Sequence, residues 1–315
     1  MISLRYHIVS IAAAFLALAI GVVLGSTALN GSLLSGLSDE KSNLGQQVGD
    51  LEAERNGLNA RLSDADAFAG AVGPKAVAGQ LDQRTVVLVT TQDGTPADRD
   101  AVKDLIGKSG GTVTGEVQLT ESFADPAKAD QLREVVTRLQ PAGAQFPTAG
   151  DPGTLAGALM GSTLLLNKES AQPQSTPEEL AAALGGLTDG GFVRPSVDVR
   201  PAQLAVVLTG GKAAGDGAGD RAATVGRFAA QLDRSGAGTV LAGGSGSAEG
   251  TGSIGVVRAD TSATSILSTV DNVDSASGRV VAVLALREQL EGGAGRYGIA
   301  GNAQAPAPGV DQEGS

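Results

Sequence analysis

One long, uncharged apolar segment near the N-terminus constrains the chain most. Residues 8–29 read IVSIAAAFLALAIGVVLGSTAL, a run of 22 residues without a charged side chain. Because a helix needs about 20 apolar residues to cross a bilayer, the run predicts a transmembrane helix. A cleaved signal peptide is the alternative, since Arg5 precedes the run and Ser26-Thr27-Ala28 resembles a cleavage site. The run exceeds the usual apolar core of about 7–15 residues in signal peptides, which favours an uncleaved signal anchor over residues 1–32.

Charges at the two ends of this segment predict its orientation. Arg5 and the terminal amine precede the segment, whereas Asp39, Glu40 and Lys41 follow it. Positive charge favours the cytoplasmic side, so the N-terminus is expected in the cytoplasm. No later segment is long and apolar enough to cross back. We therefore expect a single-pass protein of the cell membrane with its bulk on the outer side.

Leucines recur every seven residues directly after the apolar segment. With these leucines at d positions, the a positions read Leu34, Lys41, Val48, Arg55 and Leu62. Such a repeat predicts a coiled-coil stalk over residues 33–70, and its polar a residues favour a homodimer, parallel or antiparallel. The predicted coiled-coil seam consists of Leu37, Leu44, Val48, Leu51, Leu58 and Leu62. An amphipathic helix lying on the globular part of the same chain is the alternative.

Short apolar runs alternate with helix signals over residues 80–300. Strands are expected at 85–90, 112–119, 204–209, 239–242, 254–258 and 279–286. Runs such as VVLV and LAVVL are apolar on both faces, as expected for strands covered by helices on each side. A cap residue followed by proline marks helix starts at Thr95-Pro96, Asp125-Pro126, Asp151-Pro152 and Thr176-Pro177. The predicted fold class is α/β, a mostly parallel sheet with helices on both faces.

Two finer divisions of this region are expected. The order strand, helix, strand occurs at 85–119 and again at 204–242, so two duplicated βαβ halves with a break near 141–175 are one interpretation. Chance similarity of two such units is the other interpretation, and it is favoured because their side chains differ. The polar segment 301–315 is rich in Pro and Gly and predicts a disordered tail.

Composition excludes several functional classes. The 315 residues include 34 acidic and 23 basic side chains, a net charge of −11, and the basic residues are scattered, so nucleic acid is not an expected partner. The chain has no Cys and only one His, His7, which excludes a catalytic triad, a thiolate nucleophile and a multi-His metal site within one chain. We therefore do not expect an enzyme, and no catalytic or cofactor-binding residue is assigned. For copper, the available ligands are Met1, Met160 and His7, and the metal ligands remain unknown.

For three motifs we favour a structural role over a ligand-binding role. Gly107-Lys108-Ser109 resembles a phosphate loop, but it is placed at a helix C-terminus and lacks the required preceding glycine. The glycine-rich segment 243–247 follows a strand, and an exposed flexible loop is favoured over an anion site. The oxygen-rich segments 216–220 and 271–274 do not match a calcium loop, so turn formation is the better account.

Several segments together resemble one family of envelope proteins. They are the opening MISLRYHIVSIAAAFLALAIGVVLGS, the leucine heptad, LAVVLTGG, and STVDNVDSASGRVVAVLAL followed by RYG. From Met1 to about Gly298 the chain is similar to the MctB family of actinobacterial envelope proteins. This resemblance implies a role in copper export or homeostasis, copper as the transported ion, and an outer-membrane location. It also implies an alternative, a membrane-anchored scaffold that regulates cell separation and peptidoglycan hydrolases through a membrane or envelope partner.

Overall fold

The computed structural model describes residues 4–148 and 150–310, without the side chains of residues 4 and 26–36. The chain forms two units, residues 1–65 and residues 66–315. Some predictions concern positions outside this description. They are the candidate ligand Met1, the a-position side chain of Leu34 and residues 311–315 of the predicted tail.

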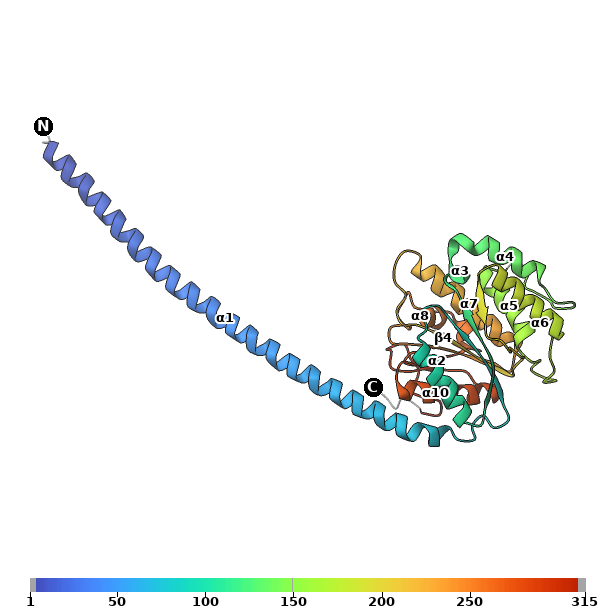
Figure 1. The fold of residues 1–315 in the computed structure, drawn as a ribbon. Coiled ribbons are helices and arrows are strands. Elements are labelled where there is room, and N and C mark those ends of the chain that lie inside the picture. The colour runs from blue at the N-terminus through green and yellow to red at the C-terminus, as the bar shows by residue number, and fades with distance from the viewer. Residues whose placement is uncertain (1–3, 149, 311–315) are drawn as a thin grey trace. The chain divides into compact units, whose positions relative to one another are not determined.

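The first unit is formed by a single helix. Helix α1 runs Leu4–Val77, so its last turns belong to the second unit (Figure 1). Within α1, residues Arg5–Gly25 are long and apolar enough to cross a membrane. The predicted membrane segment and the predicted stalk are therefore parts of one uninterrupted helix.

A seven-stranded sheet forms the centre of the second unit. Its strands are β1 (Thr85–Thr90), β2 (Thr112–Leu119), β3 (Val193–Pro195), β4 (Leu204–Thr209), β5 (Gly238–Gly243), β6 (Ser268–Val270) and β7 (Arg296–Tyr297). The strand order is β3-β2-β1-β4-β5-β6-β7. Every neighbouring pair is parallel except β2 with β3. Strands β1 and β4 pair in the register Val86 to Leu204, so both predicted βαβ segments share one continuous sheet.

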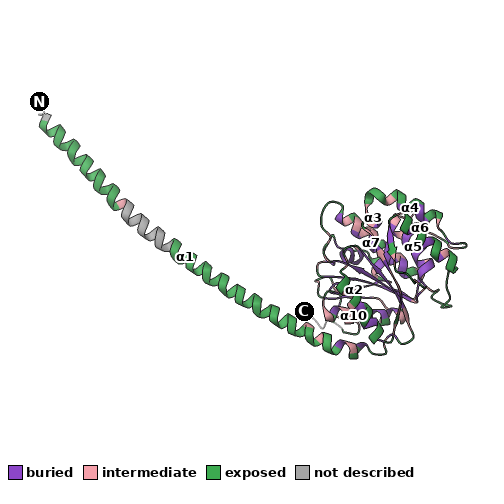
Figure 2. Ribbon diagram, viewed as in Figure 1, coloured by how far each residue is buried: buried purple, intermediate pink, exposed green. Residues whose placement is uncertain are grey.

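Helices cover both faces of the sheet, which confirms the predicted fold class (Figure 1). They are α2 (Pro96–Lys108), α3 (Glu121–Ala124), the 3-10 turn η1 (Pro126–Lys128), α4 (Ala129–Arg138), α5 (Pro152–Leu164), α6 (Pro177–Asp189), α7 (Ala218–Ser235), α8 (Ser253–Arg258), α9 (Thr261–Thr264) and α10 (Ala276–Leu290). Successive strand residues point to opposite faces. Val87 and Val89 pack with helices α3 to α9, whereas Val86 and Leu88 pack with the end of α1, α2 and α10. Both faces of the central strands are therefore buried (Figure 2).

The predicted helix starts are confirmed. Thr95, Asp125, Asp151 and Thr176 are N-caps whose side chains accept backbone N–H groups of the following turn. At α6 the arrangement is reciprocal, because Thr176 N also donates to Glu179 Oε2 at 2.9 Å. The backbone N–H groups of Thr176 and Ala142 stabilise the carboxylate of Glu179 and lower its pKa.

Two predicted strands are wrong, because residues 254–258 lie in α8 and residues 279–286 lie in α10. Helix α10 begins where the Ser275 side chain accepts the N–H of Gly278 at 3.0 Å. Its buried residues then recur at helical spacing, as in Ala282, Ala285 and Leu286. A short apolar run is compatible with a buried strand or a buried helix, and tertiary packing decides between them. Strands β3, β6 and β7 were not predicted, since two or three residues show no period.

Residues 301–310 contact the rest of the second unit, so the prediction of disorder is wrong for this segment. Asn302 Oδ1 accepts a hydrogen bond from Arg258 Nη1 at 2.7 Å, and Asn302 Nδ2 donates to the Ala248 carbonyl at 2.9 Å. Ala305 is buried and forms a bridge with Tyr297. Composition predicts disorder where a segment lacks apolar contacts of its own, but here the folded unit supplies the partners.

Candidate functional site

The strand order of the sheet reverses direction between β1 and β4. From β1 the chain continues to β2 on one side, and from β4 it continues through β5, β6 and β7 on the other. Because β1 and β4 are parallel neighbours, their carboxyl ends lie side by side at one edge of the sheet. Open α/β sheets bind ligands outside the carboxyl ends of strands at such a reversal. This edge is therefore the candidate functional site.

A pocket of about 430 Å³ lies at this reversal. Its buried floor includes Thr91, Leu119, Phe123, Thr209, Ala222 and Val225. Its charged lining residues are Asp93, Glu121, Lys212 and Arg221. The Phe123 ring packs edge-to-face on Phe228, with 5.3 Å between ring centroids, which holds the floor in place. The pocket thus combines an apolar base with charges of both signs.

Asp93 lies just beyond the end of β1, against the end of β4. The hydroxyl of Thr91 donates to Asp93 Oδ1 at 2.5 Å. A Cβ atom at Gly210 would lie only 2.7 Å from Asp93 Oδ2, so the carboxylate can occupy this position only because residue 210 is glycine. The local sequence therefore fixes one acidic group at the reversal.

The loop between β4 and α7, residues 210–217, carries Lys212, and hydrogen bonds from the Arg221 side chain hold the loop in place. Arg221 is half-buried near the start of α7 and donates to the carbonyls of Asp216 at 2.6 Å and Ala214 at 2.8 Å. Lys212 forms an ion pair with Glu249 at 2.6 Å, and this hydrogen bond and charge raise the pKa of Lys212. The Lys212 side chain is therefore cationic at neutral pH.

The glycine-rich segment 243–247 is packed rather than flexible, contrary to the prediction. Gly244 N donates to the Gly210 carbonyl at 3.2 Å, Ser245 N to Asp274 Oδ2 at 3.1 Å, and Ser247 N to the Gly244 carbonyl at 3.0 Å. Gly243, Gly244 and Ser247 are buried. The glycines here allow two loops to pack closely, and three of the backbone donors that an anion would need already have partners.

The remaining motifs have the structural roles that were predicted. Gly107-Lys108-Ser109 lies at the C-terminus of α2, where the Ser109 hydroxyl donates to the Ile106 carbonyl at 2.7 Å. The segment 216–220 contains the start of α7, which begins after Gly217 in a left-handed conformation with φ of 70°. Gly107-Lys108-Ser109 therefore does not present the helix N-terminus that a phosphate loop requires.

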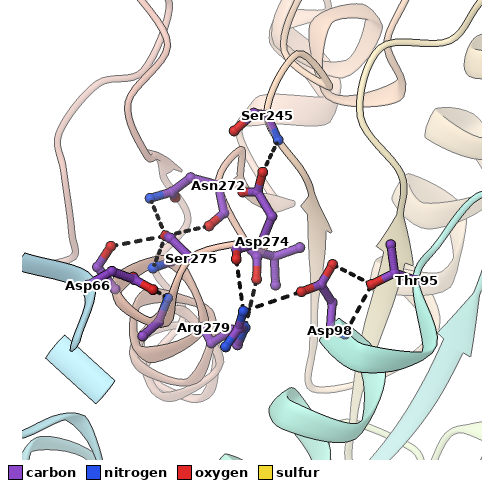
Figure 3. A network of polar contacts seen from close by, with 12 residues as sticks. Asp66, Thr95, Asp98, Ser245, Asn272, Asp274, Ser275 and Arg279 are labelled. Carbon is purple, nitrogen blue, oxygen red and sulfur yellow. Dashed lines mark hydrogen bonds and ion pairs between the residues drawn. The ribbon is translucent and has the colours of Figure 1, made fainter. Parts of the chain in front are cut away.

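The oxygen-rich segment 271–274 forms a turn within a polar network (Figure 3). The Ser275 hydroxyl donates to the Asn272 carbonyl at 2.8 Å, and Ala276 N donates to Asp66 Oδ1 at 2.6 Å. Arg279 Nη2 donates to the Asp274 carbonyl at 2.8 Å and pairs with Asp98 at 3.4 Å. The network joins the end of α1 and the start of α2 to α10. The hydrogen bond from Ser275 to Asn272 closes the turn that was predicted. Among the described residues, no group of three acidic or imidazole side chains could hold a metal ion.

Sequence reasoning missed a buried ion pair beside this turn. Arg258 Nη1 lies 2.6 Å from Asp271 Oδ2, and both side chains are almost fully buried. Burial lowers the pKa of Arg258, while the hydrogen bond to Asp271 opposes this shift. Asp271 also accepts the N–H of Ile299 at 2.8 Å, and Arg258 Nη2 donates to the Tyr297 carbonyl at 2.8 Å. The pair could not be predicted because residues 254–258 read as a strand.

The predicted seam residues lie on α1 and are largely exposed within the single chain. The exposed fractions of Leu37, Leu44, Val48, Leu51, Leu58 and Leu62 range from 51% to 67%. Six apolar side chains at heptad spacing therefore share one exposed stripe of the helix. A single chain does not test pairing, so the coiled coil and the homodimer stay predictions.

The candidate copper ligands do not define a site in the described part of the chain. Met160 is fully buried within α5, and His7 lies in the Arg5–Gly25 segment of the first unit. Met1 is outside the described residues. The metal ligands stay unassigned.

Comparisons with known proteins cover nearly the whole chain. The model of a family described as "Copper transport outer membrane protein, MctB" matches residues 1–308. The chain is 42% identical over 303 residues to a protein named Copper transporter MctB from Mycobacterium tuberculosis (strain ATCC 25618 / H37Rv), covering 95% of this chain and 96% of the relative. It is also 42% identical over 307 residues to the Copper transporter MctB of Mycobacterium leprae (strain TN), with the same coverage. The apolar helix, the heptad segment and the α/β unit all fall within these matches, and the chain therefore belongs to the MctB family.

Proposed function

We propose that this protein acts in copper export or homeostasis at the cell envelope. The observation that carries the proposal is the 42% identity to proteins named Copper transporter MctB over 95% of the chain. Copper would be the transported ion, and no residue of this chain is assigned as its ligand. Because the match covers both units, we treat the helix and the α/β unit as parts of one functional protein.

We further propose that α1 anchors the protein in the cell membrane without cleavage. Residues Arg5–Gly25 supply the span, and Arg5 on the N-terminal side favours a cytoplasmic N-terminus. The α/β unit would then lie on the outer side of the cell membrane. The family description names an outer membrane, so fractionation of the two membranes distinguishes the two locations.

Assembly through the predicted seam is the second part of the proposal. Six apolar side chains on α1 are each more than half exposed, and burying such side chains contributes up to about 1.5–3 kcal/mol each. A second copy of the same helix offers a matching stripe, which supports a homodimer. A single spanning helix cannot enclose an ion path, and the segment 8–29 has no charged side chain to line one, so we place copper movement in an assembly of such helices with a membrane or envelope partner.

The test compares strains that lack the protein and are complemented with full-length variants. The seam variant combines Leu44→Asp, Leu51→Asp and Leu58→Asp. The matched control combines Gln46→Asp, Ala53→Asp and Ala60→Asp, which adds the same charge on the opposite side of the heptad repeat. Cell-associated copper after a copper challenge, cell separation and the amount of membrane-bound protein are measured in the same cultures.

The expected result is a rise in copper without the protein, restored by the wild type and the control variant but not by the seam variant. A seam variant that remains dimeric and functional would contradict the assembly step. Unchanged copper in cells that fail to separate would contradict the copper role. In that case the protein would instead be a scaffold that regulates cell separation and peptidoglycan hydrolases through a partner.

A further inference from the structure

We propose that the pocket at the β1–β4 reversal binds a zwitterionic ligand with a short apolar body, of the class of a free amino acid or a short peptide. The ligand would place its ammonium group near Asp93 and Glu121 and its carboxylate near Arg221. This inference does not depend on the proposed copper role. It rests on the separation of charge in the pocket, on the missing counter-charges and on the apolar floor.

The two signs of charge come from opposite sides of the reversal. Asp93 follows β1, and Glu121 begins α3 directly after β2. Lys212 follows β4, and Arg221 lies near the start of α7, which leaves the β4 side of the sheet. Because β2, β1 and β4 are consecutive in the sheet, the acidic groups and the cations line the pocket from different halves of the unit.

Three of the four charged lining groups, Asp93, Glu121 and Arg221, have no charged partner within the described residues, whereas Lys212 is already paired with Glu249. Glu121 has no hydrogen bond or ion pair in the described part of the chain, and Asp93 accepts only the Thr91 hydroxyl. Arg221 donates to two neutral carbonyls and has no carboxylate partner among the described residues. Charge-assisted hydrogen bonds are stronger than neutral ones, so a ligand with both an ammonium and a carboxylate group gains at both walls.

The floor of the pocket selects for an apolar body between these charges. Leu119, Phe123 and Val225 are buried beneath the pocket and offer no hydrogen-bonding side-chain atom. The volume of about 430 Å³ lies within the range of small-molecule sites. An amino acid with an aliphatic side chain, or a short peptide that contains one, covers the floor and places its two charges at the walls.

A phosphate-bearing ligand fits the pocket less well. The carboxylates of Asp93 and Glu121 would repel it, and the neighbouring N–H groups of Gly244, Ser245 and Ser247 already have partners. The zwitterion is thus the ligand class that uses the charges as they stand.

Calorimetric titration of the full chain in detergent micelles, in metal-free buffer, tests this proposal. The probes are L-leucine and the dipeptide L-alanyl-L-leucine. N-acetyl-L-leucine lacks the ammonium group, and L-leucinamide lacks the carboxylate. We expect at least one zwitterion to bind, and each blocked compound to bind at least about tenfold more weakly, because one charge-assisted contact is lost.

Variants test which side of the pocket binds each charge of the ligand, the acidic wall of Asp93 and Glu121 or the basic wall of Arg221. Arg221→Gln should abolish the preference for leucine over leucinamide and keep the preference over N-acetyl-leucine. The double variant Asp93→Asn, Glu121→Gln should do the opposite. Arg227→Gln removes an exposed charge on α7 that does not line the pocket, and it should behave as the wild type.

Several results would overturn the proposal. They are no binding of either zwitterion at millimolar concentrations, equal binding of the blocked compounds, or wild-type binding by both wall variants. Arg221→Gln also removes the contacts that hold the loop 212–217, so thermal unfolding of each variant is recorded alongside. The acidic double variant leaves those contacts intact and tests the proposal even if Arg221→Gln unfolds. Binding is measured on purified protein, so its failure and the failure of the copper role are distinguishable.

Discussion

Two leucines show how differently the two units of this protein use apolar residues. Leu51 in α1 is 63% exposed, whereas Leu88 in β1 is fully buried between α2, α10 and the neighbouring strands. Both belong to strongly patterned apolar stretches. The second unit buries its apolar pattern beneath its own helices, whereas the seam side chains of α1 are more than half exposed in the described part of the chain. The surroundings proposed for these residues lie outside the chain, a bilayer for residues 8–29 and another helix for the seam.

The strongest test of this comparison replaces each of the two leucines by alanine. We expect Leu88→Ala to lower the free energy of unfolding of the second unit by about 2–5 kcal/mol, because it leaves a cavity in a packed core. Leu51→Ala should change that free energy by less than about 0.5 kcal/mol. Urea unfolding of the full chain in detergent measures both. Equal destabilisation by the two substitutions would break the comparison, since Leu51 would then share a core with the second unit.

The second test uses a buried carboxyl group of the α/β unit. Burial raises the pKa of Asp233 from 3.8 to about 7, and the N–H of Thr239, which donates to Asp233 Oδ1 at 2.6 Å, offsets only part of this shift. The folded state therefore favours the protonated acid. Its contribution to stability is full below about pH 4 and is lost as pH rises to about 7.

Asp233→Asn removes this titration. We expect its stability relative to the wild type to rise by on the order of 1–3 kcal/mol between about pH 4 and about pH 8. Urea unfolding at the two pH values measures the change, with Asp220→Asn on the exposed face of α7 as the control. A difference that does not vary with pH would show that Asp233 titrates normally in the folded state.

The smallest expected effect concerns the exposed part of α1 in the first unit. A Cβ atom at Gly45 of α1 would meet nothing within 4 Å. Gly45→Ala should therefore stabilise the helix by about 0.5–1 kcal/mol through helix propensity alone. Thermal loss of helical circular dichroism should shift upward for α1, while the unfolding midpoint of the second unit stays unchanged. A shift in the second unit would mean that the two units unfold together.

Local signals in the sequence predicted much of the fold because their physics is local. Proline and cap residues marked the starts of α2, α5 and α6, since a capping hydrogen bond spans only two or three residues. The strands β1, β4 and β5 were predicted because their apolar runs are buried on both faces of a parallel sheet. The stretch VVAVLAL was placed in a strand for the same reason, but it lies in α10, where the cap at Ser275 and contacts with α2 and the sheet favour a helix.

The candidate site could not be predicted, because its residues lie far apart in the chain. Asp93, Glu121 and Arg221 meet at one pocket only through the order of the strands. The glycine-rich segment 243–247 looked like a flexible loop, yet Gly243 and Gly244, together with Gly210 and Gly211, let two loops pack closely. Asn302 looked like the start of a disordered tail, and its partner Arg258 is 44 residues away.

The sequence by itself determined that the chain has a membrane-spanning length of uncharged helix, a seven-residue leucine repeat and an α/β unit. Each of these follows from the periodicity or length of apolar residues, which a linear chain already displays. Only the tertiary structure decided which apolar runs are strands, that β1 and β4 meet at a reversal, and that opposite charges face one pocket there. Those features depend on contacts between residues distant in sequence, and neither propensity nor composition specifies such contacts.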